Sequence, residues 1–340
     1  MDRASGLSRD PSLGPAEDTE VPDWLAELGI AGLVDLHTHF LPERVLRKVW
    51  QYFDRAGTHY GLEWPIHYRY DEATRLKTLR ALGVRRFAPL VYPHKPGMAE
   101  WLNSWVHEFG TRTEGAVPTA TMYPEPGVSE YVAAALDAGI RCVKLHVQVG
   151  EFDPRDPLLD PAWGLLAEAG TPVVIHCGHG PLRGRFTGLD VFAEVLERHP
   201  RLVAVLAHAG MPEYARALDF VRSYPNVYVD TTMVGVAFSE RLAPLPPDWT
   251  ERLVGVADRV VLGSDFPNIP YPYAEQLAAV AGWAFADRML GIPFLRSVLH
   301  DTPARLLGYD GDAVTEAADP PEGSVGVQAA EPARGIESES

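Results

Sequence analysis

Strand-like and helix-like segments alternate eight times along this chain of 340 residues, and this alternation restricts the fold more than any other feature. Short apolar, β-branched runs predict strands at residues 33–40, 85–92, 116–122, 141–149, 172–177, 202–207, 226–231 and 260–264. Strands that alternate with helices predict a parallel sheet. Eight such units predict a closed (β/α)8 TIM barrel of the α/β class, which commonly reaches this length as one domain.

The segments between the strands carry recognisable helix ends. Asp160 is predicted to cap a helix that begins with Pro161 and ends at Gly170. Gly83 and Gly139 follow two further helical patterns, in the position where a helix often needs a left-handed residue.

Residues 41–70, after the first strand, are longer than a simple connection and rich in aromatic residues. We expect this long insertion either to cover the mouth of the barrel or to form an aromatic cluster that only seals the rim.

The two ends of the chain differ in composition from its body. The formal net charge is −16, of which residues 1–20 hold −3 and residues 310–340 hold −7, which leaves −6 for the body. Both end segments contain little that could be buried, so we expect disordered tails at 1–20 and 310–340 around one barrel at 21–309. The body has no basic stripe of the kind that binds nucleic acid.

The two cysteines, Cys142 and Cys177, lie inside predicted buried strands and are too few for a disulfide framework. The first residues lack the apolar core of a signal peptide, and no segment approaches the roughly eighteen apolar residues of a membrane span. We therefore expect a cytoplasmic protein that acts on a small molecule, with no nucleic-acid or membrane partner. Barrels of this type often pair through exposed helices, so a homodimer is one open arrangement.

Metal-ligating side chains recur at the C-terminal ends of the predicted strands, where the active sites of TIM barrels lie: His37, His39, His176, His208 and Asp265. His37 and His39 are two residues apart in a strand, so both imidazoles can reach one ion. His176 can supply a third nitrogen, and Asp265 an oxygen, to zinc or a similar divalent ion. Asp265 can also take a proton from metal-bound water. His208 is either a ligand of a second ion or an acid/base that polarises the substrate carbonyl.

Lys144 distinguishes a site with one ion from a site with two. It lies on the predicted fourth strand and shares a face with His146. An unmodified ammonium would bind a substrate carboxylate or an aspartate, whereas a lysine carboxylated by carbon dioxide would bridge two ions. We favour the unmodified lysine and one ion. His146 could orient Lys144 or the ligands, although a plain strand-end histidine is the simpler interpretation.

Arg183 and Arg185 lie in a glycine-rich segment directly after the fifth strand. They could bind an anionic substrate, such as a carboxylic acid, through bidentate hydrogen bonds. The alternative is that both belong to a solvated loop.

Five motifs, DLHTHF, VKLH, VVIHCG, LAHAG and GSDFP, resemble in this order those of the amidohydrolase superfamily. They are most similar to its amidohydrolase-related branch, which also holds decarboxylases similar to aminocarboxymuconate-semialdehyde decarboxylase. The late segment DTPARLLG resembles the segment that closes many such barrels, with Asp301 where Asn is usual. The resemblance implies His37, His39, His176 and Asp265 as metal ligands and His208 as the general acid/base. It does not imply the number of ions, because the family contains members with one ion, two or none.

Three functions follow as hypotheses. The first is a metal-dependent hydrolase, in which metal-activated water attacks the carbonyl of an amide, lactone or similar bond. The alternative is a non-oxidative decarboxylase, a lyase for a small unsaturated or aromatic acid. A catalytically silent barrel that only binds a partner is disfavoured, because such a barrel has no need of the ligand set.

Overall fold

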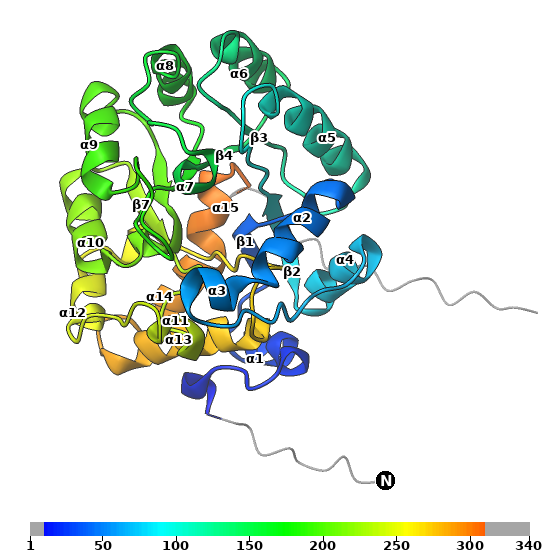
Figure 1. Cartoon of the computed structure of the whole chain (residues 1–340). Helices are drawn as coiled ribbons and strands as arrows, with labels where there is room; N and C mark the ends of the chain where they lie inside the picture. The colour runs from blue at the N-terminus through cyan, green and yellow to red at the C-terminus, as the bar shows by residue number, and fades with distance from the viewer. Residues whose placement is uncertain (1–9, 310–340) are drawn as a thin grey trace, which may run out of the picture. The chain divides into compact units, whose positions relative to one another are not determined.

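The computed structural model describes residues 10–309, in which helices surround a barrel of eight parallel strands (Figure 1). The strands are β1 (Leu33–Thr38), β2 (Val84–Pro89), β3 (Thr119–Thr121), β4 (Cys142–His146), β5 (Val173–His176), β6 (Ala204–Leu206), β7 (Val227–Asp230) and β8 (Val260–Val261). Each lies within or next to a strand expected from the sequence. Their apolar residues are mostly buried, as expected for strands that are covered on both faces.

Helices follow the strands and cover the barrel. They are α1 (Val21–Glu27), α2 (Glu43–Phe53), α3 (Ala56–Tyr60), α4 (Glu72–Ala81), α5 (Ala99–Arg112), α6 (Val128–Asp137), α7 (Val147–Gly150), α8 (Asp160–Ala169), α9 (Leu189–Arg198), α10 (Tyr214–Ser223), α11 (Ala237–Glu240), α12 (Trp249–Val254), α13 (Tyr273–Ala286), α14 (Gly291–Arg296) and α15 (Thr302–Leu306). Short 3-10 turns occur at Pro11–Leu13 (η1), Asp18–Glu20 (η2), Ala207–Gly210 (η3) and Ala257–Arg259 (η4), and a π-helical turn at Ser297–Asp301 (η5).

The strands join in the order of the sequence. β3 to β8 form one parallel sheet, and β1 pairs with β2. A bridge between Phe87 and Ala116 links β2 to the segment before β3, and a bridge between Thr38 and Phe266 links β1 to the segment after β8. These two seams close the eight strands into a (β/α)8 TIM barrel.

Inside the barrel, side chains of the strands pack against α15, the last helix among the described residues. Ala304 and Leu307, in and just after α15, belong to one core cluster with residues of six strands: Val34, Leu36, Ala88, Cys142, Val174, Val205 and Val261. The barrel is therefore a filled core rather than a pore.

The predicted helix ends are correct at the glycines and wrong at Asp160. Gly83, Gly139 and Gly170 all have positive φ, which a residue without Cβ adopts at little cost. The residue before the helix is Leu159, and Asp160 is already helical. Its carboxylate instead contacts Nε2 of His199 at 3.1 Å, so a tertiary contact replaces the expected cap.

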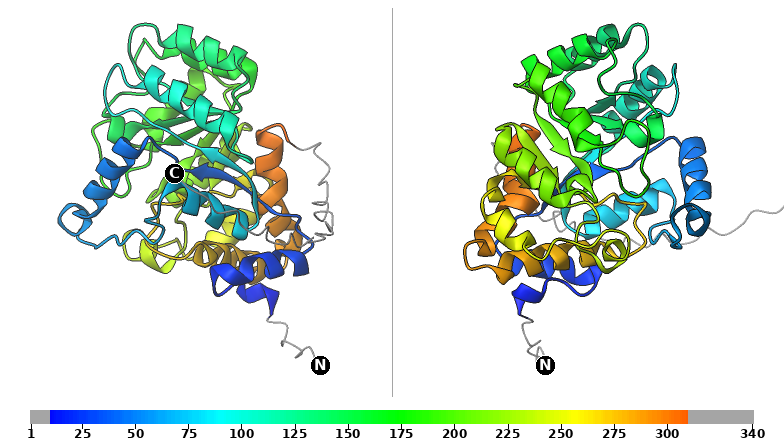
Figure 2. Two further views of the ribbon diagram at one scale, coloured as in Figure 1. Left: turned by 90° about the vertical axis from the view of Figure 1, so that its right-hand side faces the viewer. Right: turned by 60° about the vertical axis from the view of Figure 1, so that its left-hand side comes forward.

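The expected disorder of residues 1–20 is not found in the part that the structure describes. Residues 10–20 form η1 and η2, and Figure 2 shows this end of the chain beside α13. Nε1 of Trp24 donates to the carbonyl of Pro11 at 2.9 Å, and the amide of Ala274 donates to Asp18 at 3.0 Å. These long-range contacts give a polar segment its structure. Residues 1–9 and the acidic segment 310–340 lie outside the described residues.

The long insertion after β1 forms α2, α3 and the loop that leads to α4. No helix among residues 10–309 combines the length and hydropathy that crossing a bilayer requires.

Candidate metal centre

The segment after β8 folds against the end of β1 and so brings Asp265 to the two histidines. The amide of Asp265 donates to the carbonyl of His37 at 2.8 Å, and the amide of His39 donates to the carbonyl of Phe266 at 2.7 Å. Asp265 has a φ of 66°, a left-handed conformation that residues with a Cβ rarely adopt, although aspartate tolerates it better than most. Such strain persists only where the surrounding structure maintains it, and it is common at functional sites.

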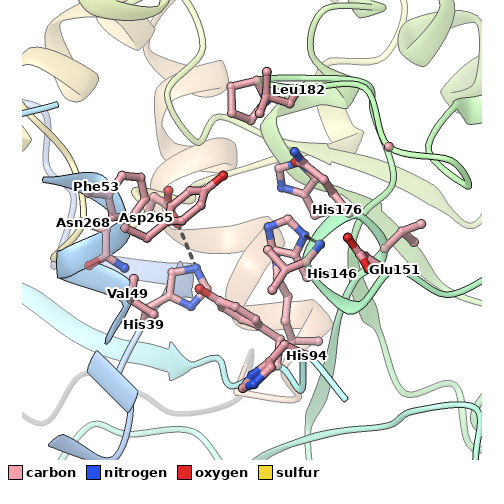
Figure 3. Close-up of a pocket in the computed structure, with 18 of the residues that line it drawn as sticks. His39, Val49, Phe53, His94, His146, Glu151, His176, Leu182, Asp265 and Asn268 are labelled. Carbon is pink, nitrogen blue, oxygen red and sulfur yellow. Dashed lines mark hydrogen bonds and ion pairs between the residues drawn. The ribbon is translucent and has the colours of Figure 1, made fainter. Parts of the chain in front are cut away.

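His37, His39 and Asp265 form a buried cluster whose ligand atoms all lie within 4.8 Å of one another. Oδ1 of Asp265 is 2.8 Å from Nε2 of His39 and 3.6 Å from Nε2 of His37. Figure 3 shows the ring of His39 facing the carboxylate of Asp265 across the cavity floor.

In His37 and His39, the hydrogen bond made by Nδ1 determines which ring nitrogen carries the proton and which carries the lone pair. Nδ1 of His39 is 2.9 Å from the carbonyl of Leu90, and Nδ1 of His37 is 2.8 Å from Oδ2 of Asp230. Both oxygens accept, so Nδ1 carries the proton in both rings and Nε2 carries the lone pair.

Two lone pairs therefore converge on a carboxylate. Nε2 of His39 and Oδ1 of Asp265 lie 2.8 Å apart, so two acceptors would repel each other there unless a proton on Nε2 or a metal ion lies between them. This donor set fits a divalent ion that takes nitrogen and oxygen ligands, zinc included.

The pKa values of the cluster favour its ligating forms. Burial lowers the pKa of His37 well below its ordinary value, and the charge of Lys144 lowers it further. Burial opposes the ionisation of Asp265. The hydrogen bond and charges of the neighbouring histidines nevertheless hold the pKa of Asp265 below its ordinary value.

Lys144 of β4 is fully buried and in contact with this cluster. Its Nζ is 2.9 Å from Nε2 of His37. Burial lowers the pKa of Lys144 to about 8, although the charges of Asp230 and Asp265 act in the opposite direction. The amine thus competes for the lone pair that an ion would use.

His176, at the end of β5, lies in the same cavity but outside the three-residue cluster. Its Nε2 is 2.8 Å from the carbonyl of Gly180, to which it donates, so Nδ1 carries the lone pair. Its ring stacks on that of His146, with centroids 4.0 Å apart (Figure 3). The role of His176 as a fourth ligand stays a prediction, and so does the role of His146.

His208, just after β6, has a φ of 55° and so also adopts a left-handed conformation. Its amide donates to Oδ1 of Asp230 at 2.7 Å, and its ring lies edge-on to those of His37 and His176. Nδ1 is buried and has no hydrogen-bond partner among the described residues. Burial lowers the pKa of His208 to about 4, so the ring is neutral at neutral pH.

Asp230 also belongs to the candidate site, where it contacts His37 and His208, although the sequence analysis did not single it out. It ends β7 after the apolar residues Val227, Tyr228 and Val229, the same pattern that marked the histidines. An apolar run that ends in an aspartate could therefore have marked Asp230 in the sequence.

Asp35, on β1, holds the elements around the site together through its buried carboxylate. Oδ1 accepts from the amide of His37 at 3.1 Å, and Oδ2 accepts from the hydroxyls of Ser264 and Tyr273 at 2.5 and 2.8 Å. The carboxylate therefore connects β1 to the turn after β8 and to α13.

A cavity of about 1350 Å³ opens above the cluster. The insertion after β1 contributes to its wall through Val45, Val49, Phe53, Tyr60 and Trp64. Arg183 and Arg185, from the loop after β5, also line it, as do His146 and Lys144.

A protein-family model described as amidohydrolase matches residues 34–309. A search of curated proteins finds no match. Several solved structures share the fold. An uncharacterised TIM-barrel protein from Bordetella bronchiseptica is 18% identical, with a TM-score of 0.64, and the match covers 82% of this chain and 99% of that one.

Two further structures have known ligands or activities in their descriptions. An amidohydrolase from Burkholderia multivorans with bound zinc is 18% identical, with a TM-score of 0.55 and coverage of 82% and 99%. A 5-carboxyvanillate decarboxylase from Sphingomonas paucimobilis is 14% identical, with a TM-score of 0.54 and the same coverage. At these identities the likeness shows the fold alone.

Proposed function

The chain belongs to the amidohydrolase family, and from this premise we propose that it is a metal-dependent hydrolase of a small molecule with an amide, lactone or similar bond. The observation that carries the proposal is the approach of the Nε2 atoms of His37 and His39 to the carboxylate of Asp265 in a buried cluster beneath a large cavity. We propose that His37, His39 and Asp265 hold one divalent ion, with His176 as the candidate fourth ligand. When bound, such an ion makes water acidic enough to attack at neutral pH and polarises a carbonyl.

Asp265 and His208 are the proposed proton carriers. Asp265 is ionised, and its Oδ2 has no hydrogen-bond donor among the described side chains, so this oxygen can take a proton from the attacking water. His208 is neutral and lines the cavity, so the N–H of its ring can give a hydrogen bond to the substrate. Lys144 supplies a positive charge beside the two carboxylates Asp230 and Asp265.

The first experiment is the metal content per chain, by elemental mass spectrometry on protein purified without chelators. We expect about one divalent ion per chain with Lys144 unmodified. Two ions, together with a mass increase on Lys144, would replace this arrangement with a bridged pair. A protein that neither retains nor responds to divalent ions would overturn the proposal.

The second experiment is the variant Asp265→Asn, assayed with metal present against a panel of esters, lactones and amides that includes p-nitrophenyl acetate. A general base contributes about 10²- to 10⁴-fold, so we expect a loss of that order. Asp258→Asn is the matched control, because the Asp258 side chain is 82% exposed and lies in η4, just before β8 and away from the C-terminal end of the strand. Retained hydrolysis in Asp265→Asn would contradict the proposed mechanism.

The second candidate function is a decarboxylase of a flat acid. The observation that favours it is the wall of the cavity, which combines aromatic side chains such as Phe53 and Trp64 with cationic ones such as Arg183. Release of carbon dioxide from a panel of aromatic and unsaturated acids distinguishes this activity from hydrolysis.

A further inference from the structure

The mouth of the cavity carries five exposed cations. Two belong to α2, one to the loop after β2 and two to the loop after β5: Arg44, Lys48, Lys95, Arg183 and Arg185. We call these five residues the cationic rim. The carboxylates that line the same cavity are Glu151 and Asp265, and Asp265 belongs to the metal cluster. The rim is therefore positive in a chain whose net charge is −16.

The cations of the rim lack carboxylate partners among residues 10–309. Arg185 lies over the ring of Phe186, with 4.9 Å to its centroid, and has no ion pair there. Elsewhere arginines are commonly paired. Arg47, one residue before Lys48 on the same helix, binds Glu43 at 2.8 Å but does not line the cavity. Five unpaired cations around one opening give it a positive potential, which attracts anions.

An apolar wall lies around the same cavity. Several large apolar side chains of this wall remain exposed, including Tyr52 at 39%, Trp101 at 48% and Leu182 at 36%. The cavity, at about 1350 Å³, exceeds the usual range of roughly 300–1,000 Å³ for small-molecule sites. Its wall can thus cover a ligand that is much longer than a small acid.

The rim surrounds the opening rather than forming one edge of it. In Figure 3, Val49 and Phe53 of α2 lie on the side of the cavity that also holds His39 and Asp265, Leu182 lies on another side and His94 on a third. Lys48, Arg183 and Lys95 directly adjoin Val49, Leu182 and His94 in the chain.

We propose that the substrate is an elongated amphipathic anion. Its aromatic or aliphatic body lies along the apolar wall, and its anionic group (a phosphate, sulfonate or carboxylate) lies at the cationic rim, at the end remote from the reacting bond. The position of the reacting bond at His37, His39 and Asp265 rests on the proposed function. The preference for an amphipathic anion rests on the rim and the wall alone.

Two fluorescent probes test this preference directly. 8-Anilinonaphthalene-1-sulfonate is an amphipathic anion, and N-phenyl-1-naphthylamine has the same rings without the sulfonate. We expect the anion to bind at least about tenfold more tightly at low ionic strength. The advantage should shrink with salt, because exposed charges are screened beyond about 10 Å at 0.1 M.

Variants assign the effect to the rim. Arg183→Ala/Arg185→Ala and Arg44→Ala/Lys48→Ala should each weaken binding of the sulfonate by about fivefold, the effect of two exposed ion pairs, and leave the neutral probe unchanged. Arg47→Ala is the matched control and should change neither. Val49→Trp fills the cavity and should weaken both probes.

Equal affinity for the two probes would overturn the proposal, and so would an equal effect of Arg47→Ala or no effect of Val49→Trp. Neither probe has a hydrolysable bond, so the affinities of both probes can be measured whether or not the protein is a hydrolase. The Asp265→Asn assay judges the hydrolase proposal separately.

Discussion

Asp230 accepts the Nδ1 proton of His37 through Oδ2 at 2.8 Å, although the two residues lie on strands that do not pair with each other. The other oxygen, Oδ1, accepts from the amides of His208 at 2.7 Å and Thr232 at 3.1 Å. One carboxylate therefore fixes the tautomer of a candidate ligand and the backbone of the candidate acid/base.

Asp230→Asn should weaken metal binding by about 10- to 100-fold, the usual effect of removing the partner behind a ligating histidine. The asparagine oxygen can still accept from the amides of His208 and Thr232. Its NH₂ group would then face Nδ1 of His37 as a second donor and favour the tautomer that has no lone pair on Nε2. Competition with a chromophoric chelator measures the affinity.

Thr232→Val is the control for this change. It removes the weaker contact to Nδ1 of His37, at 3.1 Å, but keeps Asp230. We expect a smaller loss of affinity. Wild-type affinity in Asp230→Asn would show that the carboxylate does not set the tautomer.

The left-handed backbone at His208 predicts that glycine there raises the stability of the protein relative to alanine, while both substitutions remove the activity. This backbone conformation, with φ 55° and ψ 31°, costs about 1 kcal/mol or more in a residue with a Cβ. His208→Gly and His208→Ala both remove the imidazole, but only glycine relieves the strain. We expect both variants to lose activity and the glycine variant to be more stable by about 1 kcal/mol in urea unfolding. Equal stabilities would mean that the backbone there is not strained.

The sequence predicts the barrel and much of the site because both depend on local patterns. The apolar run before His37 and the run before Asp265 mark strands, and the barrel topology then places their ends together. The pattern before Asp230 is the same, but an aspartate at a strand end does not show which ring it will face. His176 illustrates the converse, since its position follows from β5 but its contact with Gly180 depends on the loop that follows.

Other features depend on tertiary contacts that have no local signal. Residues 10–20 read as a polar tail, yet Asp18 and Pro11 bind Ala274 and Trp24. The cationic rim is likewise formed by one helix and two loops that are distant from one another in the sequence.

Asp35 predicts a pH dependence of stability. Burial raises its pKa from the ordinary 3.8 to about 7, against the hydrogen bonds from Ser264, Tyr273 and the His37 amide. Between about pH 4 and 7 the folded state then binds more protons than the unfolded state, so the contribution of Asp35 to stability falls as pH rises and is level above pH 7.

Asp35→Asn should remove this slope. We expect the free energy of unfolding of the wild type, relative to the variant, to fall by roughly 2–3 kcal/mol between pH 5 and 8. Urea titrations of both proteins with a chelator present measure it. Parallel curves would show that the three donors keep Asp35 ionised throughout this range.

Gly263, in the segment after β8, leaves room for His37, a candidate ligand. A Cβ at this position would lie 2.3 Å from Oγ1 of Thr232 and 2.8 Å from Cβ of His37. Both neighbours are buried, so Gly263→Ala should displace the ring of His37 and destabilise the fold by about 1–3 kcal/mol. Metal affinity should fall with it, because Nε2 of His37 would move relative to Asp265.

The matched control is Gly282→Ala in α13, where a Cβ would meet no atom within 4 Å. An exposed helical glycine costs about 0.5–1 kcal/mol relative to alanine, so this variant should be slightly more stable and keep full metal affinity. Calorimetry and chelator competition on both variants test the pair. If Gly263→Ala binds metal as the wild type does, close packing behind His37 is not what positions its Nε2.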